Sequence, residues 1–264
     1  MQTTTPWLWT NHRIKEAKLH LFCFPYAGGN PVIFRSWQEK FPASIGVIPV
    51  CLPGRGMRMA EPSYTDLYQL IHDLAEAMLP YLTKPFMFFG HSMGALVSYE
   101  LARYLQARYQ VQPEHLIVSA FRAPHLPDPN PPIYHLPDEE FLHELSEMNG
   151  MPKEILENKE LLDLFLPTLR TDFQICETYT HRPGLLLNYP ITVLGGKYDP
   201  DPSIEILRPW KEHTSSTCKL QVFDGDHFFI HAKEEEVIQF LCEMLTTWLE
   251  SNASTDSHVA KMRD

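Results

Sequence analysis

The segment Gly90-His91-Ser92-Met93-Gly94 holds a serine with a glycine two positions to either side. It follows the apolar run 86–89 and precedes an amphipathic segment, so we expect a strand, a tight turn and a helix. The glycines leave room where side chains would collide, and the turn lifts the Ser92 hydroxyl out of the sheet. The positive end of the helix then favours an oxyanion beside that hydroxyl. The pattern predicts that Ser92 is a nucleophile.

A serine hydroxyl needs a base, and histidine is the usual one. Of the thirteen histidines, His227 lies in FDGDHFFIHAKEEEV, between the last apolar run and the last amphipathic segment. We therefore expect it at the same sheet edge as Ser92. His231 is the rival, and with His227 it imitates a metal-binding pair; however, the HExxH glutamate is missing and no third ligand is evident. The sequence predicts His227 as the base and no metal site.

The third member of such a site is a carboxylate that fixes the histidine tautomer and stabilises the imidazolium. The segment ITVLGGKYDPDPSIE offers Asp199 and Asp201 on the loop after an apolar run. The order Ser92, aspartate, His227 is that of α/β-hydrolases. Either aspartate can instead cap the helix expected from Ser203, so we expect one to cap and the other to serve catalysis.

Two backbone N–H groups must stabilise the oxyanion. One is that of Met93, directly after the nucleophile. The other is expected in the loop FPYAGG, where Ala27 is the candidate and Tyr26 the neighbouring alternative. This loop matches neither G-x-G-x-x-G nor GxxxxGK[ST], so nucleotide binding is not expected.

Six strand-length apolar runs alternate for the most part with helix-length amphipathic segments, which predicts a parallel sheet covered by helices on both faces. Ligands then bind at the carboxyl ends of the strands. The runs are 19–24, 47–52, 86–89, 116–120, 191–194 and 220–223.

About 70 residues separate the fourth run from the fifth, beginning with the proline-rich APHLPDPNPPIYHLP and continuing with two helical patterns. We expect one α/β domain over 1–250, a helical lid inserted at 125–185, and a disordered tail at 251–264. Apolar lid residues should line or cover the substrate channel, although at least half of them are expected to pack the insertion onto the core. These residues are Phe141, Leu145, Leu161, Leu164 and Phe165.

The net charge of −11 disfavours nonspecific binding to nucleic acids or anionic membranes. Five cysteines without CxxC spacing predict small buried side chains in a reducing compartment. The chain shows neither a signal peptide at its start nor an apolar stretch of membrane-spanning length, so we expect a cytoplasmic protein.

Several segments resemble those of type II thioesterases, the discrete editing hydrolases of nonribosomal peptide and polyketide synthases, and of medium-chain acyl-carrier-protein thioesterases. The similarity runs from about residue 19 to 249 and includes LFCFPYAGG, CLPGRGMR, PFMFFGHSMGALVSYELA, GGKYDP and FDGDHFFI. It implies an α/β-hydrolase fold and hydrolysis of acyl thioesters on the phosphopantetheine arm of a carrier protein. The partner is transient, no bound cofactor is expected, and the protein is expected to be a monomer. The alternative is a chain-terminating medium-chain acyl-carrier-protein thioesterase or a small-molecule esterase.

The resemblance also bears on the open choices. Asp199 matches the family's G-x-x-D-P pattern, and Pro200 holds it extended, so Asp199 is predicted to be the catalytic carboxylate. Asp201 precedes Pro202 and Ser203 and is predicted to be the helix cap. Arg55 and Arg58 are candidates for carrier docking, or else solvated loop charges.

Overall fold

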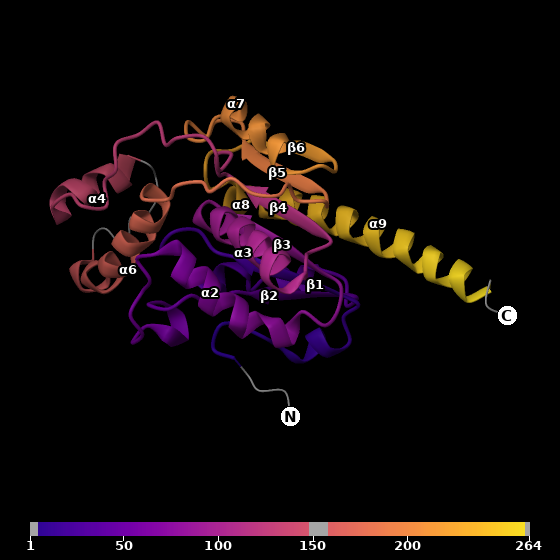
Figure 1. Ribbon diagram of the computed structural model, residues 1–264. Coiled ribbons are helices and arrows are strands. Elements are labelled where there is room, and N and C mark those ends of the chain that lie inside the picture. Colours follow the sequence, from indigo (N-terminus) through magenta and orange to yellow (C-terminus); the bar gives the residue numbers. More distant parts are fainter. Residues whose placement is uncertain (1–4, 148–157, 262–264) are drawn as a thin grey trace.

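The computed structural model describes residues 5–147 and 158–261. Its centre is a six-stranded sheet, entirely parallel, in the order β2-β1-β3-β4-β5-β6 (Figure 1). All six predicted strands are present, which confirms the predicted fold class. The second strand covers residues 45–49 in place of the predicted 47–52, because residues 50–52 lie outside the sheet. The strands are β1 Leu19–Phe24, β2 Ile45–Pro49, β3 Phe86–His91, β4 His115–Ser119, β5 Ile191–Gly196 and β6 Cys218–Phe223.

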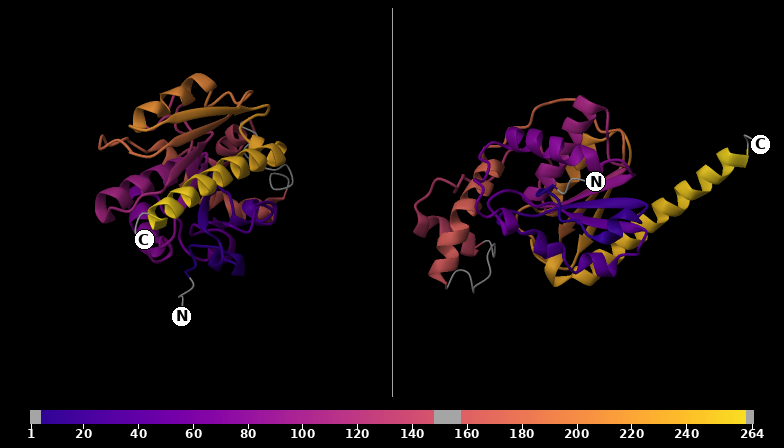
Figure 2. Two further views of the ribbon diagram at one scale, coloured as in Figure 1. Left: turned by 90° about the vertical axis from the view of Figure 1, so that its right-hand side faces the viewer. Right: turned by 90° about the horizontal axis from the view of Figure 1, so that it is seen from below.

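Helices cover both faces of the sheet (Figures 1 and 2). On β1, Phe22 and Phe24 face the core beneath helices α2 (Leu67–Met78) and α3 (Met93–Tyr109). The alternate residues Leu21 and Cys23 belong to a second core with α1 (Trp37–Lys40), α8 (Phe229–Ala232) and α9 (Glu234–Lys261). Because both faces are buried, β1 to β5 are mostly apolar, whereas the edge strand β6 is only partly buried.

The long interval between β4 and β5 contains helices α4 (Asp138–Glu147) and α6 (Lys159–Glu177), and residues 148–157 lie outside the described part. These helices lie together at one end of the sheet (Figure 1). They share a small apolar core of their own, formed by Ile133, Phe141, Leu145, Leu166 and Leu169.

Short helices join the remaining elements. The helix expected from Ser203 to His213 is α7 (Ile204–Leu207) followed by the 3₁₀ segment η5 (Arg208–His213). The other 3₁₀ segments are η1 His12–Lys15, η2 Pro31–Phe34, η3 Gly56–Arg58 and η4 Leu79–Tyr81. Within residues 5–147 and 158–261, no helix has both the length and the apolar character to cross a bilayer.

The chain end differs from the disorder predicted for residues 251–264. Helix α9 continues to Lys261 and extends away from the body of the protein (Figures 1 and 2). The segment after Glu234 contains neither glycine nor proline, so no strong helix breaker interrupts it.

Candidate active site

Ser92 occupies a strained turn between β3 and α3. Its φ of 53° and ψ of −120° are unusual for a residue with a side chain. Both flanking glycines are required: a Cβ on Gly90 would lie 2.1 Å from the Gly94 carbonyl oxygen, and one on Gly94 would lie 2.1 Å from that of Phe24. The Ser92 N–H donates to the Ser119 carbonyl at 2.7 Å. This geometry is that of a nucleophile elbow, as the sequence predicts.

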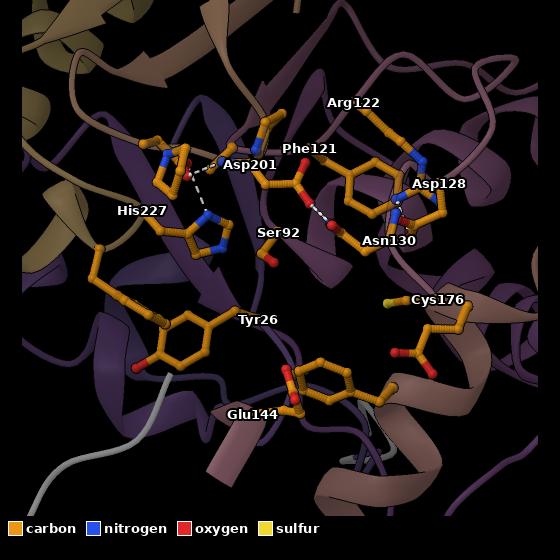
Figure 3. A pocket seen from close by; sticks show the side chains of 18 of the residues that line it. Tyr26, Ser92, Phe121, Arg122, Asp128, Asn130, Glu144, Cys176, Asp201 and His227 are labelled. Carbon is orange, nitrogen blue, oxygen red and sulfur yellow. Dashed lines mark hydrogen bonds and ion pairs between the residues drawn. The ribbon is translucent and has the colours of Figure 1, made fainter. Parts of the chain in front are cut away.

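His227 and Asp199 form a hydrogen-bonded pair beside this turn. Nδ1 of His227 lies 2.8 Å from Oδ2 of Asp199, and the two side chains are 22% and 1% exposed. The second carboxylate oxygen of Asp199 accepts the Asp201 N–H at 3.1 Å. Ser92, Asp199 and His227 line one cavity, with the serine and the imidazole facing the same space (Figure 3).

Asp201 does not have the capping role predicted for it. The cap of α7 is Ser203, since the helix begins at Ile204, and Asp201 lies two residues too early. Its carboxylate instead accepts a hydrogen bond from Asn130 Nδ2 and lines the cavity (Figure 3). Burial, helped by the nearby Asp128 charge, raises the pKa of Asp201.

The rival histidine, His231, has a different partner. Its Nε2 lies 3.0 Å from the Tyr26 hydroxyl, and burial lowers its pKa. Tyr26 also packs against Phe228, so the loop after β1 contacts the loop after β6. In the part of the chain that the structure describes, no group of three or more His, Cys, Asp or Glu side chains is arranged to hold a metal ion.

The two candidate oxyanion donors are the backbone N–H groups of Met93, which directly follows Ser92, and of Ala27. Met93 is the first residue of α3, where a backbone N–H has no partner within the helix. Ala27 lines the cavity together with Tyr26, in the loop that the sequence indicates. This arrangement allows a negatively charged oxygen to be stabilised next to Ser92.

His91, the second residue of the turn motif, is a buried neighbour that the sequence analysis leaves unassigned. Its Nδ1 lies 2.8 Å from Ser119 Oγ, and its ring centre lies 5.4 Å from that of His227. Burial holds the pKa of His91 well below its usual value. A neutral His91 therefore adds no positive charge next to His227.

The cavity has a volume of about 450 Å³, and its wall combines apolar side chains with several carboxylates. Among the described residues that line it, Arg122 is the one arginine or lysine, and it forms an ion pair with Asp128 at 2.9 Å. The other wall residues come from loops and from the insertion, and no sequence motif points to most of them. In the described part of the chain, the full set is Ala120, Phe121, Asn130, Pro131, Glu144, Phe173, Cys176, Glu177, Pro200, Pro202 and Phe228.

None of the five predicted lid residues lines this cavity. Phe141 and Leu145 are buried in the core of the insertion, Phe165 is half-buried, and Leu161 and Leu164 are exposed. The insertion reaches the cavity through other positions: Glu144 of α4, and Phe173, Cys176 and Glu177 of α6. The apolar faces of the two helices pack against each other. The residues that reach the cavity therefore include both polar and apolar side chains.

The two arginines proposed for carrier docking are buried. Arg55 is 2% exposed and forms a bidentate ion pair with Asp172, at 2.7 and 2.8 Å. Arg58 is 5% exposed, pairs with Glu61 and lies over the Trp7 ring. Neither side chain is available to a partner, and neither is a solvated loop charge.

Comparison with known proteins bears on what this site does. The thioesterase domain family matches residues 19–245. The chain belongs to the thioesterase family. Its members include hydrolases of thioesters, and the protein is therefore an enzyme of that class.

Two curated relatives are similar over nearly their whole length. Linear gramicidin dehydrogenase LgrE of Brevibacillus parabrevis is 48% identical over 246 residues, which cover 92% of this chain and 94% of the relative. Gramicidin S biosynthesis protein GrsT of Aneurinibacillus migulanus is 42% identical over 229 residues, covering 87% and 90%.

A solved structure agrees with the architecture. The type II thioesterase BorB, from the borrelidin biosynthetic cluster, superimposes with a TM-score of 0.81 at 30% identity, covering 92% of this thioesterase and 97% of BorB. The likeness confirms the α/β-hydrolase fold and the resemblance to type II thioesterases.

Proposed function

We propose that this thioesterase removes acyl or aminoacyl groups from the phosphopantetheine arm of carrier proteins, and so edits stalled or misprimed nonribosomal peptide or polyketide synthases. The observation that carries the chemistry is the strained Ser92 turn sharing a cavity with the His227–Asp199 pair. The family match and the antibiotic-biosynthesis relatives support the substrate class.

In the proposed reaction, His227 takes the proton of the Ser92 hydroxyl as the oxygen attacks the thioester carbonyl. The Met93 and Ala27 N–H groups stabilise the oxyanion, and Asp199 stabilises the imidazolium. The sulfur then leaves as the carbonyl re-forms and takes a proton from His227. Because a thiol has a pKa near 8.5, its departure needs less help from a general acid than that of an amine or alkoxide. Water activated by His227 releases the acyl group from Ser92.

The cavity wall combines carboxylates with apolar side chains. Asp128, Glu177 and Asp201 stand on it together with Phe121, Phe173 and Phe228, in a space of about 450 Å³. Such a wall admits both polar and apolar acyl groups. The preference for editing over release of a medium-chain fatty acid is therefore supported by the antibiotic-biosynthesis relatives and is tested by the substrate comparison below.

The name of LgrE suggests a second activity, that of a dehydrogenase. Such an enzyme commonly binds a nicotinamide dinucleotide at G-x-G-x-x-G after the first strand. Here β1 is followed by Pro25-Tyr26-Ala27-Gly28-Gly29, which does not fit that pattern. We therefore propose hydrolysis alone, by a monomer that meets its carrier protein transiently in the cytoplasm.

The test is to compare hydrolysis of carrier-bound acetyl, aminoacyl and medium-chain acyl groups with hydrolysis of free esters, in wild type and Ser92→Ala. We expect turnover of the short carrier-bound groups, and a covalent adduct at Ser92 with a serine-directed phosphonate. Preference for medium-chain acyl groups or for free esters would contradict the editing function. Activity of Ser92→Ala within tenfold of wild type would contradict the mechanism.

A further inference from the structure

A buried carboxylate connects helix α6 of the insertion to the loop after β1. Asp172 Oδ2 accepts the Gly28 N–H at 2.7 Å, and both carboxylate oxygens bind the Arg55 guanidinium. The side chains of Arg55 and Asp172 are 3% and 2% exposed. A buried bidentate pair keeps one geometry, because moving either partner leaves an uncompensated charge.

The loop that receives this carboxylate is a tight turn from Tyr26 to Gly29. The Gly29 N–H donates to the Tyr26 carbonyl at 2.8 Å, and Gly28 has a φ of +72°. Ala27 is not among the residues with positive φ, so the turn is of type II. Types I and II differ by a reversal of the middle peptide, which here carries the Gly28 N–H. Asp172 binds that N–H and thereby selects type II.

Ala27, the candidate oxyanion donor, lies between two peptides that are both held. The Ala27–Gly28 peptide is fixed by Asp172, and the Tyr26–Ala27 peptide by the bond from Gly29. Since the N–H and the carbonyl of a trans peptide point in opposite directions, the Ala27 N–H points away from the Gly29 side of the turn. Both turn types make the bond from Gly29, so Asp172 acts on this donor by anchoring the whole turn to α6, together with Arg55, whose Nη1 donates to the Gly29 carbonyl at 3.4 Å. The position of the Ala27 N–H relative to Ser92 therefore depends on this anchor.

We infer that Asp172 is a positioning residue for the oxyanion site and that Arg55 keeps its carboxylate in place. The inference rests on the proposed function, in which the Ala27 N–H stabilises the oxyanion. Two further contacts hold α6 against the loops of this site. The Thr168 hydroxyl donates to the Gly54 carbonyl at 2.8 Å, and the Leu169 side chain lies against Gly28. The insertion is thus needed for the reaction itself as well as for covering the substrate.

A matched pair of double variants separates positioning from stability. Arg55→Met/Asp172→Asn and Arg55→Met/Asp172→Leu both remove the buried charges, and asparagine and leucine are similar in size. Only asparagine keeps an oxygen that accepts the Gly28 N–H. Replacing a buried ion pair by apolar groups is often nearly neutral for stability, so we expect both variants to fold. The leucine variant should melt roughly 2 to 12 °C lower, because its buried Gly28 N–H has no acceptor.

The expected difference lies in kcat on an aminoacyl thioester. Complete loss of one oxyanion donor lowers kcat by roughly 10²- to 10³-fold. A turn that has lost its anchor, and with it a displaced donor, should therefore place the leucine variant roughly ten- to a hundredfold below the asparagine variant in kcat, with KM changed by less than about threefold. The rate of Ser92 labelling by a phosphonate should fall in parallel, because the phosphonyl oxygen occupies the oxyanion site.

Equal kcat values in the two double variants, or a difference in KM alone, would overturn the inference. If the leucine variant does not fold, Arg55→Met/Asp172→Ala takes its place and the same ratio decides. Wild-type labelling at Ser92 distinguishes the two proposals. If the phosphonate labels wild-type Ser92 and the two double variants have equal kcat, the positioning role alone is refuted. If the phosphonate does not label Ser92 and Ser92→Ala remains active, both the proposed function and the inference are refuted.

Discussion

Replacement of Asp199 by asparagine should reverse the tautomer of His227, the proposed base. In the wild type, Oδ2 of Asp199 lies 2.8 Å from His227 Nδ1, and Oδ1 accepts the Asp201 N–H. A carboxylate only accepts, so Nδ1 carries a hydrogen and Nε2 remains free as a base. In Asp199→Asn, the amide oxygen must still accept the Asp201 N–H, which turns the amide NH₂ toward Nδ1. The hydrogen of neutral His227 then moves to Nε2, which no longer accepts the serine proton.

The size of the effect follows from this reversal. Loss of the correct tautomer lowers kcat by about 10⁴-fold in a Ser-His-Asp enzyme, which corresponds to about 5.4 kcal/mol of barrier. KM should change little, because the Asp199 side chain is 1% exposed and has little surface for substrate contact. Stability should change by less than about 1 kcal/mol, since asparagine keeps the shape and a hydrogen bond to each neighbour.

Release of thiol from an aminoacyl thioester, followed with a thiol reagent, measures this loss directly. Asp201→Asn is the matched control, because it makes the same change two residues away, outside the pair with His227. We expect less than about a tenfold effect on kcat there. Turnover of Asp199→Asn within tenfold of wild type, or a larger loss in Asp201→Asn, would refute the assignment.

Three further predictions concern the turn, the cavity and a buried histidine. Gly94→Ala should lower the free energy of unfolding by about 3 kcal/mol or more and abolish turnover, because the new Cβ has no room. Chemical denaturation measures the change in stability, and a value within about 1 kcal/mol of wild type would contradict the prediction. Phe173→Ala should extend hydrolysis to bulkier acyl groups, because Phe173 lines the cavity. Leu164→Ala is the control, since Leu164 is exposed and does not line it. Equal selectivity of the two variants across a series of acyl substrates would contradict the placement of Phe173 on the wall. Desolvation, aided by neighbouring positive charge, lowers the pKa of His213 to about 3, so the unfolded chain binds more protons below pH 6.5 and stability falls as the pH falls. His213→Gln should reduce the slope of unfolding free energy against pH between 5 and 6 by up to about 1.4 kcal/mol per unit, and an unchanged slope would be evidence against it.

The elements that depend on local sequence could be predicted well. Buried parallel strands are apolar on both faces, and they appear as short runs whatever packs on them. The Ser92 turn could be predicted because two glycines around a serine, between a strand and a helix, form a recognised turn motif. A Cβ on Gly90 would meet the backbone of Gly94 within the motif, and one on Gly94 would meet Phe24, at the end of the neighbouring strand β1. Chain order predicted that an aspartate after β5 would meet His227 after β6, because loops after neighbouring parallel strands meet at one edge of the sheet. The resemblance and Pro200 then selected Asp199 over Asp201.

The lid residues could not be chosen from periodicity alone. A helical repeat identifies an apolar face and does not say what covers it. The apolar face of α4 presents Phe141 and Leu145 to α6, so it forms a core there and is not available to line the cavity. Leu161 and Leu164, at the start of α6, lie beyond this contact and are exposed.

The burial of Arg55 could not be predicted because its partner is distant in the chain. Asp172 lies 117 residues away, on a helix that only the tertiary structure brings to the loop. An arginine between two glycines is typical of an exposed loop, and the cost of burying it is offset only by a matched carboxylate. Asp201 was misassigned for a related reason, since its partner Asn130 comes from another loop.

Helix α6 contributes both to the wall of the cavity and to the position of the loop that bears Ala27. Phe173, Cys176 and Glu177 are spaced by three and four residues, so they share the face that lines the cavity. Asp172 and Thr168, four residues apart, share the adjacent face that holds the loops bearing Ala27 and Gly54. Because one helix carries both faces, a displacement of α6 that admits a larger acyl group would also disturb Ala27, the proposed oxyanion donor. Side-chain changes on the cavity face avoid this coupling, and selectivity is therefore expected to vary through those positions while the buried pair keeps the helix in place.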